Sequence, residues 1–502
     1  MELFLSGFTQ MLDPIIIILI FIGVFAGIIF GASPGLTAAM GMSFALPLTY
    51  VMPPLQAIAL ILGLYIGGAS GGLITAILIN IPGTPACIAT TFDGHPMAAK
   101  GNPAKALGYG IISSFFGGII SLIVLTFASP YLAKIALEFG PTEYFSVSLF
   151  ALALIAGLAG KSMLKGLTSG VIGLMLATVG QAPLDASRRF TMGIRGFNNG
   201  FQLLCALIGV YAISEILKYA ENGDDGTDKG LKNVKISGLG VKLKDFAGQW
   251  INVIRSSLIG VGIGILPGIG GATSNLIAYS ITKKTSKYPE KFGTGIKDGI
   301  IASETANNAV SGGALIPLLT LGIPGDAGTA ILLAAMTLHG VTPGPLLFET
   351  NGNLIYSIFT VLFIANIAMM ILEYFGMKIF VKMVQIPKCY LLSTIFILSA
   401  IGAMAQNNRI FDIWAVLIFG FIAYILYQFD VPPAPLIMGF ILGPIVEINL
   451  LRGLMLTEGN FLRFFDRPIP LIAILITIFY LGYTFYHSIM AILPKTEVAE
   501  VH

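Results

Sequence analysis

Residues 71–83 read GGLITAILINIPG, and residues 313–325 read GALIPLLTLGIPG, a recurrence at a constant offset of 242 residues. In both stretches an apolar run is followed by Ile-Pro-Gly. Proline cannot donate the backbone hydrogen bond that a helix interior needs, and glycine adopts conformations that other residues avoid. Each stretch therefore predicts a helix that breaks. The recurrence predicts that the chain contains two related halves.

A second pair of helix breakers lies upstream of these stretches. Pro34-Gly35 precedes the first stretch, Pro267-Gly268 precedes the second, and an apolar limb follows each of them. Because two breakers occur in the same order in both halves, an internal duplication explains the pattern better than chance matches among many Gly and Ile residues.

The composition predicts that the chain is embedded in a lipid bilayer. Hydrophobic residues make up 56% of its 502 residues, and charged residues only 11%. Soluble domains carry about 25% charged residues, because their surface must face water. We therefore predict an all-α polytopic membrane protein with about ten to twelve transmembrane helices plus broken helices or hairpins. The net charge of +3 and the lack of a basic run give no indication of nucleic-acid binding.

The distribution of Lys and Arg predicts how the halves are oriented. No Lys or Arg precedes Lys100, whereas the second half begins with five lysines between 283 and 297 and then has none until Lys378. Because cytoplasmic loops are enriched in these residues, the two halves are predicted to be inverted-topology repeats. Arg188, Arg189 and Arg195 are an exception, since counting helices places them outside, where they would meet an anion, a partner protein or loop carboxylates.

Three regions follow from these patterns. Residues 1–220 are the first membrane half, with a hairpin around Pro34 and a broken helix at Pro82. Residues 221–249 are a polar cytoplasmic loop. Residues 250–502 are the second membrane half, with a hairpin around Pro267 and a broken helix at Pro324.

Small polar residues gather at the four breaks and predict a substrate site at mid-membrane. Helix N-termini exposed by a break present N–H groups that suit a carboxylate, and hydroxyls and amides complete such a shell. The alternative is that these residues cap helices or pack in Gly-rich helices. The predicted substrate-binding residues are Ser33, Pro34, Gly35, Thr37, Asn80, Pro82, Gly83, Thr84, Pro267, Gly268, Thr273, Asn307, Asn308, Pro324 and Gly325.

Glu304 is the sharpest single candidate for ion coupling. It lies in an apolar segment, with Asn307 and Asn308 on its helix face. Intramembrane carboxylates are costly and usually functional, so Glu304 is expected to bind Na⁺ or carry a proton. The alternative is a Glu near the cytoplasmic helix end, capped by Asn. Asp326 is the other ion-coupling candidate, with helix capping as its alternative role. No other cofactor and no catalytic or metal-ligating cluster is predicted, although the sequence leaves a pairing of Glu304 with His339 open.

The chain resembles the large membrane subunit of the tripartite tricarboxylate transporter family, TctA, along almost its whole length. Each matching stretch is weak alone, but the ordered set is specific. These stretches are Gly31–Thr37, Asn80–Pro85, Thr91–Ala98, Arg189–Gly193, Leu266–Gly268, Glu304–Ala309, Leu321–Gly325, and Gly439–Gly443 running on to Glu447.

The resemblance implies an uptake system in the bacterial inner membrane. Its other parts would be a small TctB-like membrane subunit of about four helices and a periplasmic TctC-like solute-binding protein. The implied substrates are small organic anions, mostly carboxylates, moved by an ion gradient. An ion channel or ion-gated conduit for small anions is the alternative, but two inverted breaker pairs fit alternating access better. A membrane enzyme would need a convergent catalytic group that the sequence does not offer.

Overall fold

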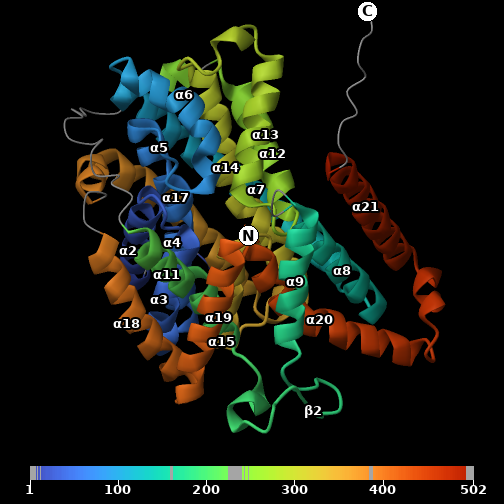
Figure 1. Cartoon of the computed structure of the whole chain (residues 1–502). Coiled ribbons are helices and arrows are strands. Elements are labelled where there is room, and N and C mark those ends of the chain that lie inside the picture. The colour runs from blue at the N-terminus through green and yellow to red at the C-terminus, as the bar shows by residue number, and fades with distance from the viewer. Residues whose placement is uncertain are drawn as a thin grey trace, which may run out of the picture. The chain divides into compact units, whose positions relative to one another are not determined.

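The computed structural model describes residues 7, 9–11, 13–158, 162–223, 240, 241, 243–246, 248–383 and 388–492. Most of these residues are helical (Figure 1). Two short strands in this part of the chain, β1 (Gly180–Gln181) and β2 (Arg188–Arg189), pair antiparallel. The predicted all-α class is therefore confirmed.

The chain forms two compact units. Unit 1 contains Met1–Glu138 and Phe201–Ile425, and unit 2 contains Phe139–Gly200 and Leu426–His502. Each of the two sequence halves contributes segments to both units. The predicted boundaries of the halves stay a prediction, and much of the predicted polar loop, residues 224–239, 242 and 247, lies outside the described residues.

Unit 1 holds the helices of both breaker regions. They are α2 (Pro14–Ala32), α3 (Ala38–Ala45), α4 (Pro54–Gly71), α5 (Leu73–Ile79), α6 (Ile88–Ala99), α7 (Pro103–Ala136), α10 (Leu203–Ile208), α11 (Ser214–Asn222), α12 (Trp250–Ile265), α13 (Gly270–Thr285), α14 (Lys297–Leu321), α15 (Ala327–Leu338), α16 (Leu346–Thr350), α17 (Gly352–Met383), α18 (Lys388–Asn407) and most of α19 (Ile410–Gln428). Short 3₁₀ turns include η1 (Leu46–Val51), η2 (Pro85–Cys87), η6 (Leu243–Phe246) and η7 (Pro289–Lys291), and η4 (Gly209–Ile213) is a π-helical turn.

Many of these helices have the length and apolarity of membrane spans. Within the described residues, eight helical stretches qualify by length and composition, and six further apolar helices have 10–17 residues. The shorter ones include α12 and α15, which border helix breaks. A multi-pass membrane protein follows from these helices.

Glycines let the helices of unit 1 approach each other closely. A Cβ placed on Gly27 of α2 would overlap the carbonyl oxygen of Leu64 on α4. In the second half, a Cβ on Gly264 of α12 would lie 2.6 Å from the carbonyl oxygen of Val310 on α14. Small residues at helix contacts are how membrane helices pack, because lipid tails give no hydrophobic drive toward association. This packing accounts for much of the unusually high glycine content.

The backbone turns in the same way at matched breaks of the two halves. Gly35 and Gly268 both have positive φ, 82° and 78°. Asn80 and Gly322 end α5 and α14 in the left-handed conformation, with φ of 59° and 73°. These positions correspond under the sequence offsets, as a duplication predicts. The opposite membrane orientation of the halves stays a prediction.

Unit 2 is a smaller helical body. It contains α8 (Pro141–Leu158), α9 (Met163–Ala177), α20 (Ala434–Leu456) and α21 (Pro468–Ile492), with η3 (Arg195–Asn199) and η8 (Phe461–Asp466). Helix α20 packs on α8 and α9, and α21 packs on α8. A Cβ on Gly439 of α20 would overlap the carbonyl oxygen of Gly170 on α9, so the same small-residue packing holds this unit together.

Candidate functional site

A buried polar network surrounds Glu304 in the interior of unit 1. Glu304 lies on α14, and none of its surface is exposed. Its carboxylate accepts hydrogen bonds from the hydroxyl of Thr90 on α6 and from Ser114 Oγ on α7, the latter at 3.2 Å. Cys87 and Asn307 also interact with this carboxylate. Side chains from both sequence halves therefore meet at one acidic group.

Asn275 ties the start of α6 to this network. Its Oδ1 accepts the backbone N–H of Ala89 at 2.7 Å, and its Nδ2 lies 3.4 Å from Thr90 Oγ1 and 3.3 Å from the carbonyl oxygen of Ser303. The first N–H groups of a helix have no partner within the helix, so a side chain from α13 supplies one here. The contact fixes α6 against α13 and α14.

Asn307 and Asn308 are neighbours on α14 with different environments. Asn307 Nδ2 donates to the carbonyl oxygen of Ala69 on α4 at 2.9 Å and lies 3.6 Å from Cys87 Sγ. Asn308 Nδ2 donates to the carbonyl oxygen of Glu304 in its own helix, at 3.2 Å. Asn307 therefore joins the two halves, while Asn308 bonds within α14.

Sequence reasoning missed a second buried carboxylate, Glu373 on α17. Its Oε2 accepts a 3.0 Å hydrogen bond from Ser70 Oγ on α4, and only 1% of the residue is exposed. The signal was present in the sequence, because Glu373 is a lone acidic residue in a long apolar helix. Such residues are functional candidates by default, and the same argument had selected Glu304.

The helix breaks meet in pairs within each half. A Cβ on Gly83 would overlap the carbonyl oxygen of Gly31, and a Cβ on Gly325 would lie 2.6 Å from the carbonyl oxygen of Gly264. The N–H of Gly268 donates to the carbonyl oxygen of Gly325 at 2.7 Å. The predicted break residues of each half are thus neighbours in space.

Only some of the predicted site residues reach the polar network. Thr84 lies 3.6 Å from Cys87, next to Asn307. Ser33 bonds back to the carbonyl oxygen of Ile29, and Thr37 caps α3 by accepting the N–H of Met40. These two side chains therefore serve local backbone groups.

The remaining predicted residues lie at or beside the breaks. Asn80 is exposed, Thr273 is half-buried, and Pro34, Pro267 and Pro324 are buried. Pro82 is half-buried. Hydrogen bonds from the side chains of Asn80 and Thr273 are not seen in the described part of the chain, so their roles at the site stay predictions.

Asp326 caps helix α15. Its Oδ1 accepts the N–H of Thr329 at 2.8 Å, and the hydroxyl of Thr329 lies within hydrogen-bonding distance of the Asp326 backbone. Tyr65 on α4 donates to its Oδ2 at 2.6 Å. These contacts show the capping role that the sequence offered as the alternative, and its part in ion coupling stays a prediction.

Glu304 and Glu373 differ from the buried carboxylates of Glu143 and Asp412, which pair with arginines. In the described residues, no Lys, Arg or His lies within ion-pair distance of Glu304 or Glu373. Removing an unpaired carboxylate from water is very costly, and a proton or a bound cation lowers that cost. The network can therefore hold a cationic species.

Glu304 and His339 do not form the pair that the sequence left open. Glu304 bonds to Thr90 and Ser114, whereas His339 Nε2 lies 3.4 Å from Thr49 Oγ1. Within the described residues there is also no group of three or more His, Cys, Asp or Glu side chains placed to hold a metal ion.

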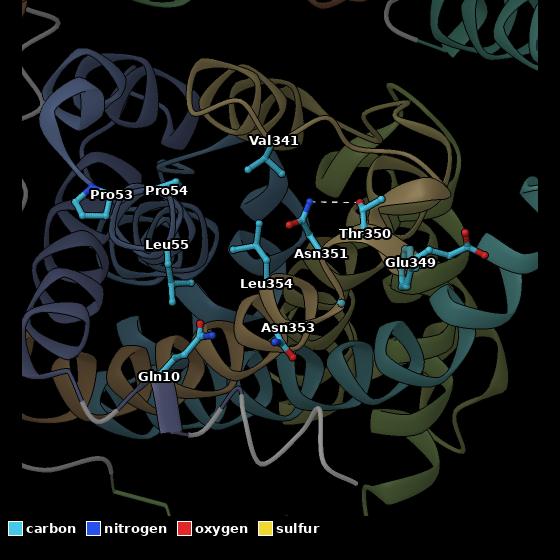
Figure 2. Close-up of a pocket in the computed structure, with 12 residues that line it drawn as sticks. Gln10, Pro53, Pro54, Leu55, Val341, Glu349, Thr350, Asn351, Asn353 and Leu354 are labelled. Atoms are coloured by element: carbon cyan, nitrogen blue, oxygen red, sulfur yellow. Dashed lines mark hydrogen bonds between the residues drawn. The ribbon is translucent and has the colours of Figure 1, made fainter.

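Two pockets open at other places in unit 1. The pocket in Figure 2 has a volume of about 650 Å³, and its lining includes Gln10, Glu349, Asn351 and Asn353. A second pocket, of about 410 Å³, has a basic lining that includes Lys100, Lys105, Lys291 and Lys297. Neither lining contains a residue of the network around Glu304. The second pocket carries the positive charge that attracts anions.

The family described as the tripartite tricarboxylate transporter TctA family matches residues 17–438. A protein of Agrobacterium vitis, described as an uncharacterized 52.8 kDa protein in the TAR-I ttuC' 3' region, is 35% identical over 463 residues, which are 92% of each chain. An uncharacterized protein in the TAR-II ttuC' 3' region of the same organism is 37% identical over 207 residues, 41% of this chain and 86% of that protein. No solved structure matches the chain.

Proposed function

The chain belongs to the tripartite tricarboxylate transporter TctA family, and we propose that it is the transport-pathway subunit of a binding-protein-dependent secondary transporter. In this proposal it imports small di- and tricarboxylates across the bacterial inner membrane. A TctB-like small membrane subunit and a periplasmic TctC-like binding protein complete the system. An ion gradient, of Na⁺ or protons, drives the uptake.

The observation that carries this proposal is the unpaired carboxylate of Glu304 at the place where both sequence halves meet. Its hydroxyl partners come from α6 and α7 of the first half, and the residue itself belongs to the second half. In secondary carriers built from repeats, substrate and coupling-ion sites lie at the repeat interface near the bilayer midplane. A carboxylate without a basic partner at that interface suits a coupling cation.

The N-terminus of α13, which lies beside Asn307, suits the carboxylate of the substrate. No side chain caps the start of α13, and a Cβ on its second residue, Gly271, would lie 2.8 Å from Asn307 Oδ1. Space next to Gly270 is open. Uncapped helix N-termini bind anions through their free N–H groups and dipole. By contrast, the start of α15 already holds the carboxylate of Asp326.

The basic pocket supports an anionic substrate as well. Its four lysines lie on the segments that the Lys distribution predicts to be cytoplasmic. In an importer, this pocket is where the substrate anion leaves toward the cytoplasm, attracted by positive charge.

The test is uptake of labelled citrate and other di- and tricarboxylates into proteoliposomes. These hold the chain, its small membrane subunit and a binding protein, with and without Na⁺ and pH gradients. Uptake that needs both the binding protein and a gradient supports the proposal. With the complex shown to be assembled, failure to take up any of these carboxylates contradicts the substrate class. Ion current without a substrate gradient, measured in planar bilayers, favours the channel alternative.

A further inference from the structure

We infer that Glu304 and Glu373 together form one binding site for a monovalent cation, Na⁺ or a proton. This inference rests on the proposed transport function and deepens it, because it adds a second acidic residue to the coupling site and gives the charge of the bound ion. It starts from an oxygen atom that the fold leaves without a partner.

That atom is Oε1 of Glu373. It is fully buried and has no hydrogen-bond partner among the described residues, while Oε2 of the same carboxylate accepts from Ser70 Oγ at 3.0 Å. Buried polar atoms in proteins nearly always have a partner, and each exception needs an explanation. A bound cation or proton would supply the missing partner.

Two neighbouring residues of α4 connect this carboxylate with the network around Glu304. Ser70, which bonds to Glu373, is adjacent on α4 to Ala69, whose carbonyl oxygen accepts from Asn307 Nδ2 at 2.9 Å. Asn307 in turn interacts with the carboxylate of Glu304. Contacts to both carboxylates thus converge on adjacent residues of α4, which is the ground for assigning them to one site.

The charges around Glu373 leave this pair uncompensated. Helix α17 packs against α2, α4, α7 and the short α16. Glu349 of α16 and the two lysines of α17, Lys378 and Lys382, are exposed. Helices α2 and α4 contain no Lys, Arg, His, Asp or Glu, and the two lysines of α7, Lys105 and Lys134, lie toward its ends. Among the described titratable groups, Glu304 is the one whose charge acts on Glu373, and the Cys87 thiol interacts with both. Two like charges in an apolar interior cannot both stay ionised without a cation.

The ligand set suits a small monovalent ion. Around the two carboxylates are the hydroxyls of Ser70, Thr90 and Ser114. In the part of the chain that the structure describes, no three His, Cys, Asp or Glu side chains are arranged to hold a metal ion. Hard oxygen ligands with two carboxylates match Na⁺, and the same pair can share one proton.

The location also explains how the cation would act on the substrate. Glu373 contacts Ser70 on α4, in the first half. Asn307 of α14 bonds to Ala69, the residue directly before Ser70 on α4. Asn307 also lies against the uncapped start of α13, where the substrate carboxylate is proposed to bind. Neutralising the acidic pair therefore changes the charge next to the anion site, which favours binding of both ions together.

The first measurement is the melting temperature of the purified complex in detergent, at increasing Na⁺ with K⁺ holding ionic strength constant, and then across pH without Na⁺. A Na⁺ site shows as a melting temperature that rises with Na⁺. A proton site shows as a pH dependence without a Na⁺ effect. In the Na⁺ titration, Glu373→Gln is expected to raise the half-saturating Na⁺ concentration about tenfold, because a ligand worth 1.4 kcal/mol changes affinity tenfold. In the pH series, the same substitution is expected to remove the pH transition.

Three further variants make the result specific. Glu138→Gln removes a carboxylate from an exposed position and should behave as the unsubstituted protein. Ser70→Ala keeps both carboxylates and removes only the hydroxyl bonded to Glu373, so a smaller weakening is expected. The double variant Glu304→Gln/Glu373→Gln should lose no more cation response than the worse single variant, since both residues serve one ion.

Two outcomes overturn the inference. One is a folded Glu373→Gln protein that keeps the unsubstituted response to both Na⁺ and pH. The other is an unsubstituted complex whose melting temperature depends on neither ion. The melting assay is separate from uptake, so the failures can be told apart. Suppose that the melting temperature responds to the cation, that Glu373→Gln removes this response, and that the complex takes up none of the carboxylate substrates. This result upholds the cation site and contradicts the proposed substrate.

Discussion

The phenol hydroxyl of Tyr65 on α4 donates a 2.6 Å hydrogen bond to Oδ2 of Asp326, the residue that caps α15. The two residues are 261 positions apart and belong to different sequence halves. A Cβ on Gly328, in the first turn of α15, would press into the Tyr65 ring, so the fold brings the ring and this turn into close contact. The break at Pro324 is thus anchored to a helix of the other half.

Replacing Tyr65 with Phe should destabilise this anchor. The change removes one hydrogen bond to a carboxylate and keeps the ring, so a loss of about 1.5–3 kcal/mol is expected. The melting temperature of the purified protein measures it. Tyr50→Phe is the matched control, because Tyr50 is 49% exposed. Equal melting temperatures for the two variants would show that the Tyr65 hydroxyl adds nothing to stability.

Glu304→Gln should weaken the dependence of uptake on the driving ion without unfolding the protein. Glutamine has nearly the same shape and keeps partners for Thr90 and Ser114, but it cannot carry the negative charge that attracts a cation. Initial uptake rates against Na⁺ concentration and pH, in proteoliposomes of the whole complex, test this. We expect the half-saturating ion concentration to rise about tenfold. Uptake with an unchanged ion dependence would remove Glu304 from the coupling site.

Asn307 and Asn308 form a natural pair for comparison. Asn307→Ala removes the bond to the carbonyl oxygen of Ala69 and the amide beside the start of α13, so uptake should fall at least about tenfold. Asn308→Ala removes a bond within α14 alone and should change uptake by less than about threefold. Substrate uptake, corrected for the amount of folded protein, gives the ratio. Similar losses in both variants would contradict a special role for Asn307.

Alanine at Gly83 or Gly325 should disrupt the paired helix breaks. A methyl group there would meet the carbonyl oxygens of Gly31 and Gly264, and crowding of this kind costs about 1–3 kcal/mol or more. Gly262→Ala is the control, because no atom lies within 4 Å of a Cβ at that helical position. Yield of monodisperse protein and melting temperature report the effect. If the Gly83 variant were as stable as the Gly262 variant, the close approach of Gly83 to Gly31 would not be needed for stability, which contradicts the prediction.

Arg189 and Glu447 form a bidentate ion pair within unit 2, at 2.5 and 3.1 Å. The side chains are 28% and 23% exposed, so the pair is partly shielded from water. Arg189→Ala should lower local stability by about 1 kcal/mol, and Arg189→Lys should recover part of it, since lysine cannot bond through two nitrogens. Hydrogen exchange of β2 and α20 measures the change. The exposed neighbour Arg188→Ala should leave that exchange unaltered.

The structure also gives Arg189 a role that the sequence left open among three. It pairs with a carboxylate, and that carboxylate is Glu447 on α20 rather than an acidic residue of a nearby loop. A pairing over 258 residues has no local signal, because neither residue occurs in a periodic pattern that points to the other. For Arg188 and Arg195, which are exposed, contact with an anion or a partner protein stays a prediction.

The helical membrane class, the family, the four helix breaks and the choice of Glu304 as a candidate could all be predicted from the sequence. Each of these depends on local chemistry or on the order of motifs along the chain. The local features are the missing backbone N–H of Pro, the wide range of φ and ψ open to Gly, and an acidic residue within an apolar segment. The tertiary structure alone decided which polar residues share a site. It separated Asn307 from Asn308, assigned Ser33 and Thr37 to local contacts, and placed Glu373 beside Ser70. The reason is physical: a helix sequence fixes which residues share a face, but the partner of a face is set by close packing between helices distant in the chain.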